Sequence, residues 1–242
     1  RQGQGGGGDG GSTASDSPST GEDVYLTIST SASTSGLYTF YASIPDAVAT
    51  VYPHIHITAM EGSGANSSNQ AVSDGSAQIG AASSLANYNN YHGLDIFTEA
   101  DPTIRTFINC QPSPVVMAVS VESGITNYSE LDGQRICPGS TGSSTTTIFQ
   151  SLADGLGIEP DWRPASGPDS LDAFSDRQNV GIGKSCSGNY DSLIVQMNAS
   201  HPTDILSMTD EELNILIDAF PMMSEWVIPA GSYDFVDHDV TT

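Results

Sequence analysis

Two glycine- and serine-rich segments decide the fold of this chain, Gly62-Ser63-Gly64-Ala65-Asn66 and Gly139-Ser140-Thr141-Gly142-Ser143-Ser144. The first follows the strand-like run 54–58, and the second follows the strand-like run 134–137. A helix-like run comes after each of them. A glycine-rich turn from a strand into a helix presents backbone N–H groups at the helix N-terminus, where a carboxylate or phosphate binds. Two such turns in separate α/β halves indicate a ligand held between two lobes.

The charge of the chain is strongly negative. Among 242 residues, 6 Lys and Arg stand against 29 Asp and Glu, which gives a formal net charge of -23. This balance excludes nucleic acid as a partner, because nucleic-acid binding needs a basic surface. It also excludes docking on anionic lipid. The acidic residues are scattered, and the near-absence of lysine resembles proteins from salt-loving archaea, in which salt screens the self-repulsion.

The N-terminal tract, residues 1–23, is rich in Gly, Ser, Asp and Thr and shows no apolar periodicity. This composition predicts a flexible tether. A tract of this kind typically follows a removed signal or a lipid-anchored cysteine, which favours an exported, surface-tethered lipoprotein. An ordinary disordered tail is the alternative. No apolar run reaches the ~20 residues that span a bilayer, so we expect membrane contact only through an N-terminal anchor or tether.

The three cysteines have no metal-ligand spacing. Cys137 and Cys186 each end a strand-like run, so either they form a disulfide that leaves Cys110 free, or all three are small buried hydrophobes. Three N-glycosylation sequons begin at Asn66, Asn127 and Asn198.

Strands alternate with helices along the chain, which predicts an α/β fold with mainly parallel sheets. The runs 24–29, 103–110 and 115–121 are among the predicted strands. No nucleophile with a matching base is visible, and Gly183-Lys184-Ser185 fails as the tail of a P-loop because Gln178 stands where glycine is needed. The sequence therefore predicts no enzyme, no cofactor and no metal site.

The order of motifs resembles the TAXI family of solute-binding proteins of TRAP transporters, over about residues 24–240. The resemblance rests on five segments in a fixed order. The first is a strand followed by a small-residue loop and a helix with an aromatic residue, and the second is the first glycine-rich segment. The third is a turn into a buried strand, the fourth a Leu-x-Gly-Gln-Arg strand with its loop, and the fifth a Pro-Ala-Gly-x-Tyr segment. These stand at Thr30–Tyr41, Gly62–Asn66, Asp74–Ser84, Leu131–Thr145 and Ile228–Tyr233.

The resemblance implies a two-lobe, periplasmic-binding-protein-like type II fold with ligand in the cleft. We expect the tether at 1–23, lobe I at 24–116, lobe II at 117–226, and a crossover segment at 227–242 that returns toward lobe I, with a C-terminal part shorter than in most members. The implied function is extracytoplasmic capture of a small organic acid or amino acid for a TRAP permease. Loops at the carboxyl ends of parallel strands bind ligands in such folds.

The expected ligand-binding residues come from three small-residue loops and their neighbours. They are Ser31, Tyr38, Ser63, Asn66, Ser83, Ser140, Thr141, Ser143, Ser144 and Thr145. Two alternatives of other classes stay open. A cell-surface structural or filament subunit would show a self-complementary apolar edge, and an enzyme of the same bilobal fold would need an acid, base or nucleophile in the cleft.

The charge yields a prediction about salt. Because self-repulsion is screened as the Debye length falls from ~30 Å at 0.01 M to ~3 Å at 1 M salt, the melting temperature should rise across that range of KCl. Thermal melts followed by circular dichroism check this. A midpoint that stays constant or falls with KCl contradicts the halophilic interpretation.

Overall fold

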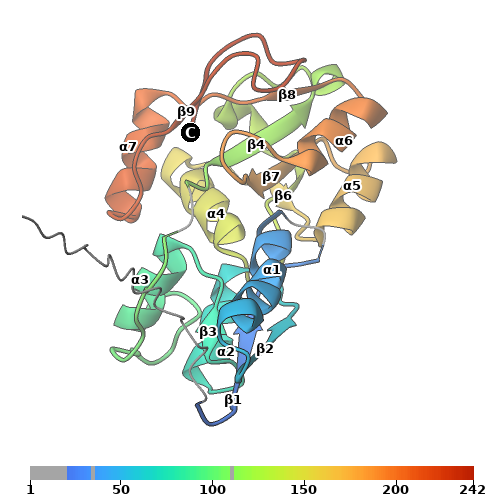
Figure 1. The fold of residues 1–242 in the computed structure, drawn as a ribbon. Coiled ribbons are helices and arrows are strands. Elements are labelled where there is room, and N and C mark those ends of the chain that lie inside the picture. The colour runs from blue at the N-terminus through green and yellow to red at the C-terminus, as the bar shows by residue number, and fades with distance from the viewer. Residues whose placement is uncertain (1–20, 34–35, 110–111) are drawn as a thin grey trace, which may run out of the picture.

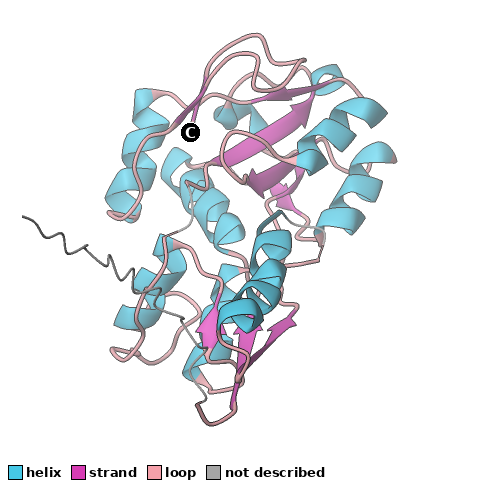
Figure 2. Ribbon diagram, viewed as in Figure 1, coloured by secondary structure: helices cyan, strands magenta, loops and turns pink. Residues whose placement is uncertain are grey.

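The computed structural model describes residues 21–33, 36–109 and 112–242. Two α/β lobes stack on one another, with α1, α2 and α3 around the lower sheet and α4, α5, α6 and α7 around the upper one (Figure 1). The chain passes from the first lobe into the second ahead of β4, which begins at Val115. Cyan helices flank the magenta strands of both sheets in Figure 2, which confirms the predicted α/β class.

The first lobe holds a parallel three-stranded sheet in the order β2-β1-β3. Its strands are β1 (Val24–Ser29), β2 (Ile55–Met60) and β3 (Ile79–Gly80). Its helices are α1 (Gly36–Val51), α2 (Ala65–Ser73) and α3 (Ser84–His92). Because all three strands run parallel, their carboxyl ends meet at one edge of the sheet, and the segments that follow them meet there too.

The strand predicted at 103–110 is wrong over its described part, because residues 103–109 form no strand. Local hydrogen bonds replace a strand ladder: Asp101 accepts from the Thr103 backbone and hydroxyl, and Arg105 donates to the carbonyls of Pro102 and Ile104. None of the strands in the described part of the chain pairs with the segment, and Phe107 is 70% exposed. A run of strand-forming residues adopts a strand only where a sheet edge is available to pair with it.

The second lobe holds a mixed five-stranded sheet in the order β6-β5-β7-β4-β8. Its strands are β4 (Val115–Ser120), β5 (Arg135–Cys137), β6 (Asp161–Trp162), β7 (Gly181–Ser185) and β8 (Thr203–Ile205). Its helices are the short η1 (Val121–Ser123) and η2 (Tyr128–Leu131), then α4 (Ser144–Leu156), α5 (Gly167–Ser175), α6 (Ser192–Ser200) and α7 (Asp210–Ala219). β5 runs parallel to β6 and β7, whereas β4 runs antiparallel to β7 and β8.

Strand β4 organises the core of this lobe, because its side chains alternate between the two faces of the sheet. Met117 and Val119 join a buried cluster with Phe149 of α4 and Leu216 of α7. Val116 and Ala118 join a second cluster that includes Phe174, Ile194 and Met197 from α5 and α6. A strand buried on both faces reads as a continuous apolar run, which is why Val115–Val119 was visible in the sequence.

The C-terminal segment packs on the second lobe. β9 (Val227–Ile228) and β10 (Val240–Thr241) form an antiparallel pair. Tyr233 and Val236 between them lie buried in the second cluster. The Thr242 hydroxyl donates to the carbonyl of Val115, at the junction of the two lobes. The lobe boundaries drawn from the sequence, and the expected return of 227–242 toward lobe I, stay predictions.

The two lobes are unequally packed. Both buried apolar clusters of the described residues lie in the second lobe, and Leu85 of α3 is the member that comes from the first. Apart from Ile28, Leu85 and Phe97, the buried apolar side chains described in the first lobe are alanines, namely Ala71, Ala77, Ala81 and Ala86. Since burial free energy follows apolar area, the second lobe carries most of the hydrophobic stabilisation.

The core of the second lobe yields a prediction. Phe149 is fully buried and stacks on Tyr128, with 6.4 Å between the centroids of the two rings. Phe149→Ala should therefore lower the free energy of unfolding by about 3–5 kcal/mol. Gln150→Ala, one residue along the same helix and exposed, is the matched control and should cost less than about 0.5 kcal/mol. Urea unfolding in molar KCl measures both, and equal losses contradict the assignment of this core.

Candidate functional site

A cleft of about 1670 Å³ lies between the lobes and is lined by residues of both. From the first lobe it receives the ends of β1, β3 and the loop before α2, and from the second lobe it receives the loop before α4 and the end of β7. Pockets for single small ligands typically measure about 300–1,000 Å³, so the cleft has room for a small molecule together with ordered water.

Three helix N-termini meet at this cleft. Ser83 caps α3 by accepting from the Ala86 N–H at 3.1 Å, and Ser143 caps α4 by accepting from the Thr146 N–H at 3.3 Å. Gly64 caps α2 with a φ of 145°. Each helix end carries the positive pole of its macrodipole and unpaired backbone donors. Their meeting makes an anion-binding environment from two lobes at once.

The lobes touch at these same ends. The Ser83 hydroxyl lies 3.3 Å from the Ser144 hydroxyl and donates to it. A Cβ atom on Gly64 would lie 3.3 Å from the Cβ of Ser143, and the φ of Gly64 is one that side-chain-bearing residues rarely adopt. A residue with a side chain at position 64 would therefore strain the backbone and would require Ser143 to shift by a few tenths of an ångström. This close approach, together with the positive φ, explains why position 64 is a glycine.

Hydroxyl groups extend the polar wall of the cleft on the α4 side. The Thr145 hydroxyl pairs with the Ser185 hydroxyl at the end of β7 at 2.9 Å. Serine and threonine hydroxyls both donate and accept, so this wall suits the oxygen atoms of an organic acid.

Most of the residues predicted as ligand-binding line the cleft. They are Ser31, Ser63, Ser83, Ser140, Ser143, Ser144 and Thr145. Tyr38, Asn66 and Thr141 are not among the lining residues. Ligand binding by the predicted residues stays a prediction, and the sequence did not determine the direction in which each side chain points.

The side chain of Asn66 is turned into the first lobe. It is 1% exposed, and its Oδ1 atom is buried without a hydrogen-bond partner. Burial of this kind argues against a glycan on Asn66 in the folded chain. The other two sequon asparagines are partly exposed: Asn127 accepts from the Glu130 N–H as the cap of η2, and Asn198 accepts from the Thr203 N–H. Glycosylation at those two positions stays a prediction.

The sequence analysis missed two charged residues of the cleft, Lys184 and Asp191. The Lys184 Nζ lies 3.3 Å from Asp191 Oδ2, and their side chains are 23% and 10% exposed. Lys184 is the one lysine of the chain and stands at the end of a strand-like run. That position was the available signal, because residues at the carboxyl ends of strands face the ligand in open α/β sheets.

Of the two alternatives for Cys137 and Cys186, the disulfide is not formed, since both cysteines are free and buried. Register explains this, because Cys137 lies opposite Ile182, four residues away from Cys186. The Cys137 thiol faces the Gly139 carbonyl, and the Cys186 thiol lies 3.9 Å from the Tyr233 hydroxyl. Burial raises the pKa of Cys137, and it raises the pKa of Cys186 to about 12. Cys110 lies outside the described residues.

Other chemistry is sparse in the part of the chain that the structure describes. There, no group of three His, Cys, Asp or Glu side chains is arranged to hold a metal ion. His56 stacks on Tyr25, and its Nε2 lies 3.2 Å from Asp23 Oδ1 at the exposed end of the first lobe. None of the helices described there is long and apolar enough to cross a bilayer.

Comparison with known proteins places the chain by family and by fold. A family model described as the NMT1-like family matches residues 28–242. Among curated proteins, no sequence matches significantly.

Three solved structures share the fold at low sequence identity. The alkanesulfonate-binding protein SsuA from Xanthomonas axonopodis pv. citri, bound to MOPS, is 17% identical with a TM-score of 0.53, over 77% of this chain and 61% of that one. The effector-binding domain of QuiR in complex with shikimate is 14% identical with a TM-score of 0.53, over 78% and 82%. A Streptococcus mutans structure described with glutathione import through GshT is 12% identical with a TM-score of 0.51, over 78% of each chain. The chain thus spans 61% of the length of SsuA.

The buried thiols yield a prediction. In a Cys110→Ser variant without added reductant, Ellman's reagent should react with native Cys137 and Cys186 at least about a hundredfold more slowly than after unfolding in urea, because both thiols are buried and protonated. Two thiols should be titrated once the chain is unfolded. A count of zero in urea would contradict the free thiols and restore the disulfide.

Proposed function

The chain belongs to the NMT1-like family, and from that membership we propose that it is an extracytoplasmic solute-binding protein that captures a small organic acid or amino acid between its lobes. The proposal rests on one observation above all. The N-termini of α2, α3 and α4, contributed by two lobes, meet at a single hydroxyl-lined cleft.

Electrostatics supports an anionic group on the ligand. Across the chain, acidic residues outnumber basic ones by 29 to 6. Among the described residues that line the cleft, the acids are Asp101, Asp172 and Asp191, and the bases are Arg105 and Lys184. The cleft is thus close to neutral within a strongly acidic protein, and the helix ends add positive partial charge to it. A small acid meets less repulsion here than elsewhere on the surface.

The similar structures support the same class of ligand. SsuA was solved with MOPS and the QuiR domain with shikimate. MOPS carries a sulfonate and shikimate carries a carboxylate, so both ligands bring an anionic group to this fold. By analogy, the ligand of this chain would bring a carboxylate into the cleft, where the helix N-termini and their backbone N–H groups favour negative charge.

We further propose that the captured ligand is passed to the membrane permease of a TRAP transporter. The resemblance to the TAXI family supports this step, through the motifs at Gly62–Asn66, Leu131–Thr145 and Ile228–Tyr233. The glycine-rich composition of residues 1–23 supports a tether that keeps the protein at the cell surface. A haloarchaeal origin fits the net charge of -23.

The experiment that tests this function starts with native mass spectrometry of the purified chain in volatile salt. We expect one bound small acid or amino acid, to be identified by fragmentation and then measured by calorimetry. Ser63→Asp and Ser140→Asp each place a carboxylate in the cleft, one from each lobe, and should lower affinity about ten- to hundredfold, as for loss of a hydrogen bond to a charged group.

Ser129→Asp is the matched control, because Ser129 lies exposed in η2 and is not a lining residue of the cleft. It adds the same charge to the chain and should leave affinity unchanged. If all three variants bind the ligand as tightly as the original chain, the glycine-rich loops are only turns and do not contact the ligand. A product that accumulates when ligand and protein are incubated would point instead to an enzyme of this fold.

A further inference from the structure

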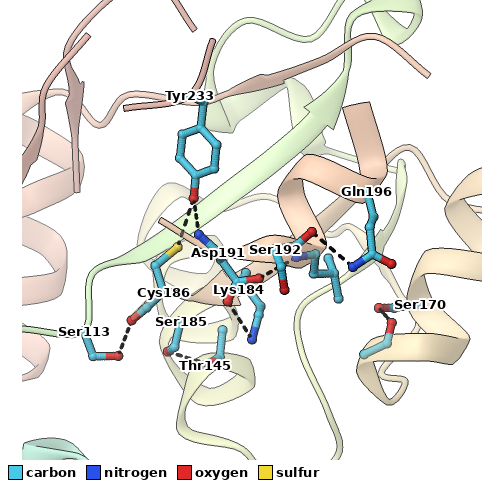
Figure 3. Close-up of polar contacts among 12 residues, drawn as sticks. Ser113, Thr145, Ser170, Lys184, Ser185, Cys186, Asp191, Ser192, Gln196 and Tyr233 are labelled. Carbon is cyan, nitrogen blue, oxygen red and sulfur yellow. Dashed lines mark hydrogen bonds and ion pairs between the residues drawn. The ribbon is translucent and has the colours of Figure 1, made fainter. Parts of the chain in front are cut away.

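Strand β7 divides the polar groups of the cleft between two faces. Neighbouring side chains of a strand point to opposite faces of the sheet. On the α4 face, Ser185 pairs with Thr145, and a Cβ on Gly183 would meet the Phe149 ring at 2.5 Å. Lys184 therefore points to the other face, toward α5 and α6, where it meets Asp191 (Figure 3). The hydroxyl wall and the ion pair are two separate polar regions of one cleft.

Asp191 is held rigidly on this second face. Its Oδ1 accepts from the Leu193 N–H at 2.9 Å and so caps α6. Its own N–H donates to the hydroxyl of the buried Tyr233 at 2.8 Å. Figure 3 shows Tyr233 reaching down to Asp191, with Ser192 beside it. Its carboxylate is thereby fixed with Oδ2 toward Lys184 at the wall of the cleft.

We infer that Lys184 and Asp191 form a charge-paired subsite that selects a zwitterionic ligand, one that carries both an ammonium and a carboxylate group, over a simple anion of the same carbon skeleton. This inference rests on the proposed function and narrows its ligand class from acids in general to amino acids. The carboxylate of the ligand lies against the Lys184 ammonium, and the ammonium of the ligand lies against the Asp191 carboxylate.

The hydrogen-bonding capacity of the pair supports this assignment. An ammonium group has three N–H donors, of which the ion pair engages one. A carboxylate has about four lone-pair sites, and the Leu193 N–H and Lys184 account for two of them. The pair therefore offers donors and acceptors side by side, which is the complement of a zwitterion.

The same pair disfavours ligands of a single charge. An anion bound at Lys184 also faces the carboxylate of Asp191, which is 10% exposed and therefore poorly screened by solvent. A lone cation meets the converse repulsion from Lys184. A zwitterion presents an attractive partner to each charge, and specificity of this kind comes from the repulsion of the wrong ligand as much as from the attraction of the right one.

An ion pair that serves folding alone is the alternative. Buried ion pairs contribute little net stability, because desolvation opposes the Coulomb attraction. Lys184–Asp191 is also the least exposed of the lysine and arginine ion pairs in the described residues. The two interpretations differ in ligand preference, which a purely structural pair would leave unchanged.

The test measures binding of the protein L-amino acids, each beside the carboxylic acid of the same skeleton without the amino group. Thermal shift in molar KCl screens the panel, and calorimetry gives the affinities. We expect at least one amino acid to bind about tenfold or more tightly than its deaminated counterpart. In the double variant Lys184→Gln/Asp191→Asn this preference should fall below about threefold, since the amide pair carries no charge while Asn still caps α6.

The matched control is Arg163→Gln/Asp161→Asn, which neutralises an exposed ion pair of 2.8 Å in the same lobe and should keep the preference. Should the double variant fail to fold, Asp191→Asn alone, with its cap preserved, gives the same readout. Deaminated acids that bind as tightly as amino acids to the original chain overturn this inference and leave the proposed function standing. A preference that survives the double variant overturns the assignment to Lys184 and Asp191. Failure of every acid and amino acid to bind overturns both proposals.

Discussion

The structure depends on holding three helix N-termini of like partial charge against one another. The ends of α2, α3 and α4 come from two lobes and meet where Gly64 approaches Ser143 and Ser83 contacts Ser144. Like poles repel, so their meeting is favourable only where hydroxyls or a bound anion supply compensating oxygen atoms, and it is sterically possible only where the residues in contact are small. The lack of a side chain at position 64 and the serine caps both follow from this requirement. So does the chemistry of the ligand that we propose.

The second lobe provides the rigid support for this arrangement. β4 buries side chains on both faces of its sheet, and β7 lies beside it with its carboxyl end at the cleft. Alternation along β7 then sends Ser185 toward α4 and Lys184 toward α6. Tyr233, from the C-terminal segment, fixes the backbone of Asp191 from behind. A single central strand thus supplies both polar regions of the cleft, and the last residues of the chain stiffen one of them.

The sequence predicted the parts of the fold that depend on local pattern. The glycine-rich turns, the α/β alternation and the apolar run of β4 are visible because they follow from backbone conformation and burial. The features that local pattern did not determine depend on distant partners. Asn66 lies in a glycine-rich segment beside the cleft, yet its side chain is buried. Cys137 and Cys186 lie at the ends of neighbouring strands, yet they are not opposite one another in the strand register.

Lys184 is a cleft residue that the sequence analysis missed for the same reason. Its position at a strand end was visible, but its partner Asp191 lies beyond a turn, and their contact exists only once α6 is docked. Likewise, the run at 103–109 has the residue pattern of a strand but finds no sheet edge in the described structure. Pattern determines which conformation a segment favours, whereas tertiary contacts determine whether it adopts it.

The poor packing of the first lobe has a consequence for how the protein behaves in time. Because its described buried side chains are mostly alanines, we expect this lobe to have a smaller free energy of local unfolding than the lobe that contains β4. Its backbone amide hydrogens would then exchange with solvent through sub-global unfolding. The amide hydrogens of the second lobe would exchange only through global unfolding. The protein would then consist of two cooperative units with different free energies of unfolding. The contacts at the cleft couple the less stable first lobe to the more stable second lobe.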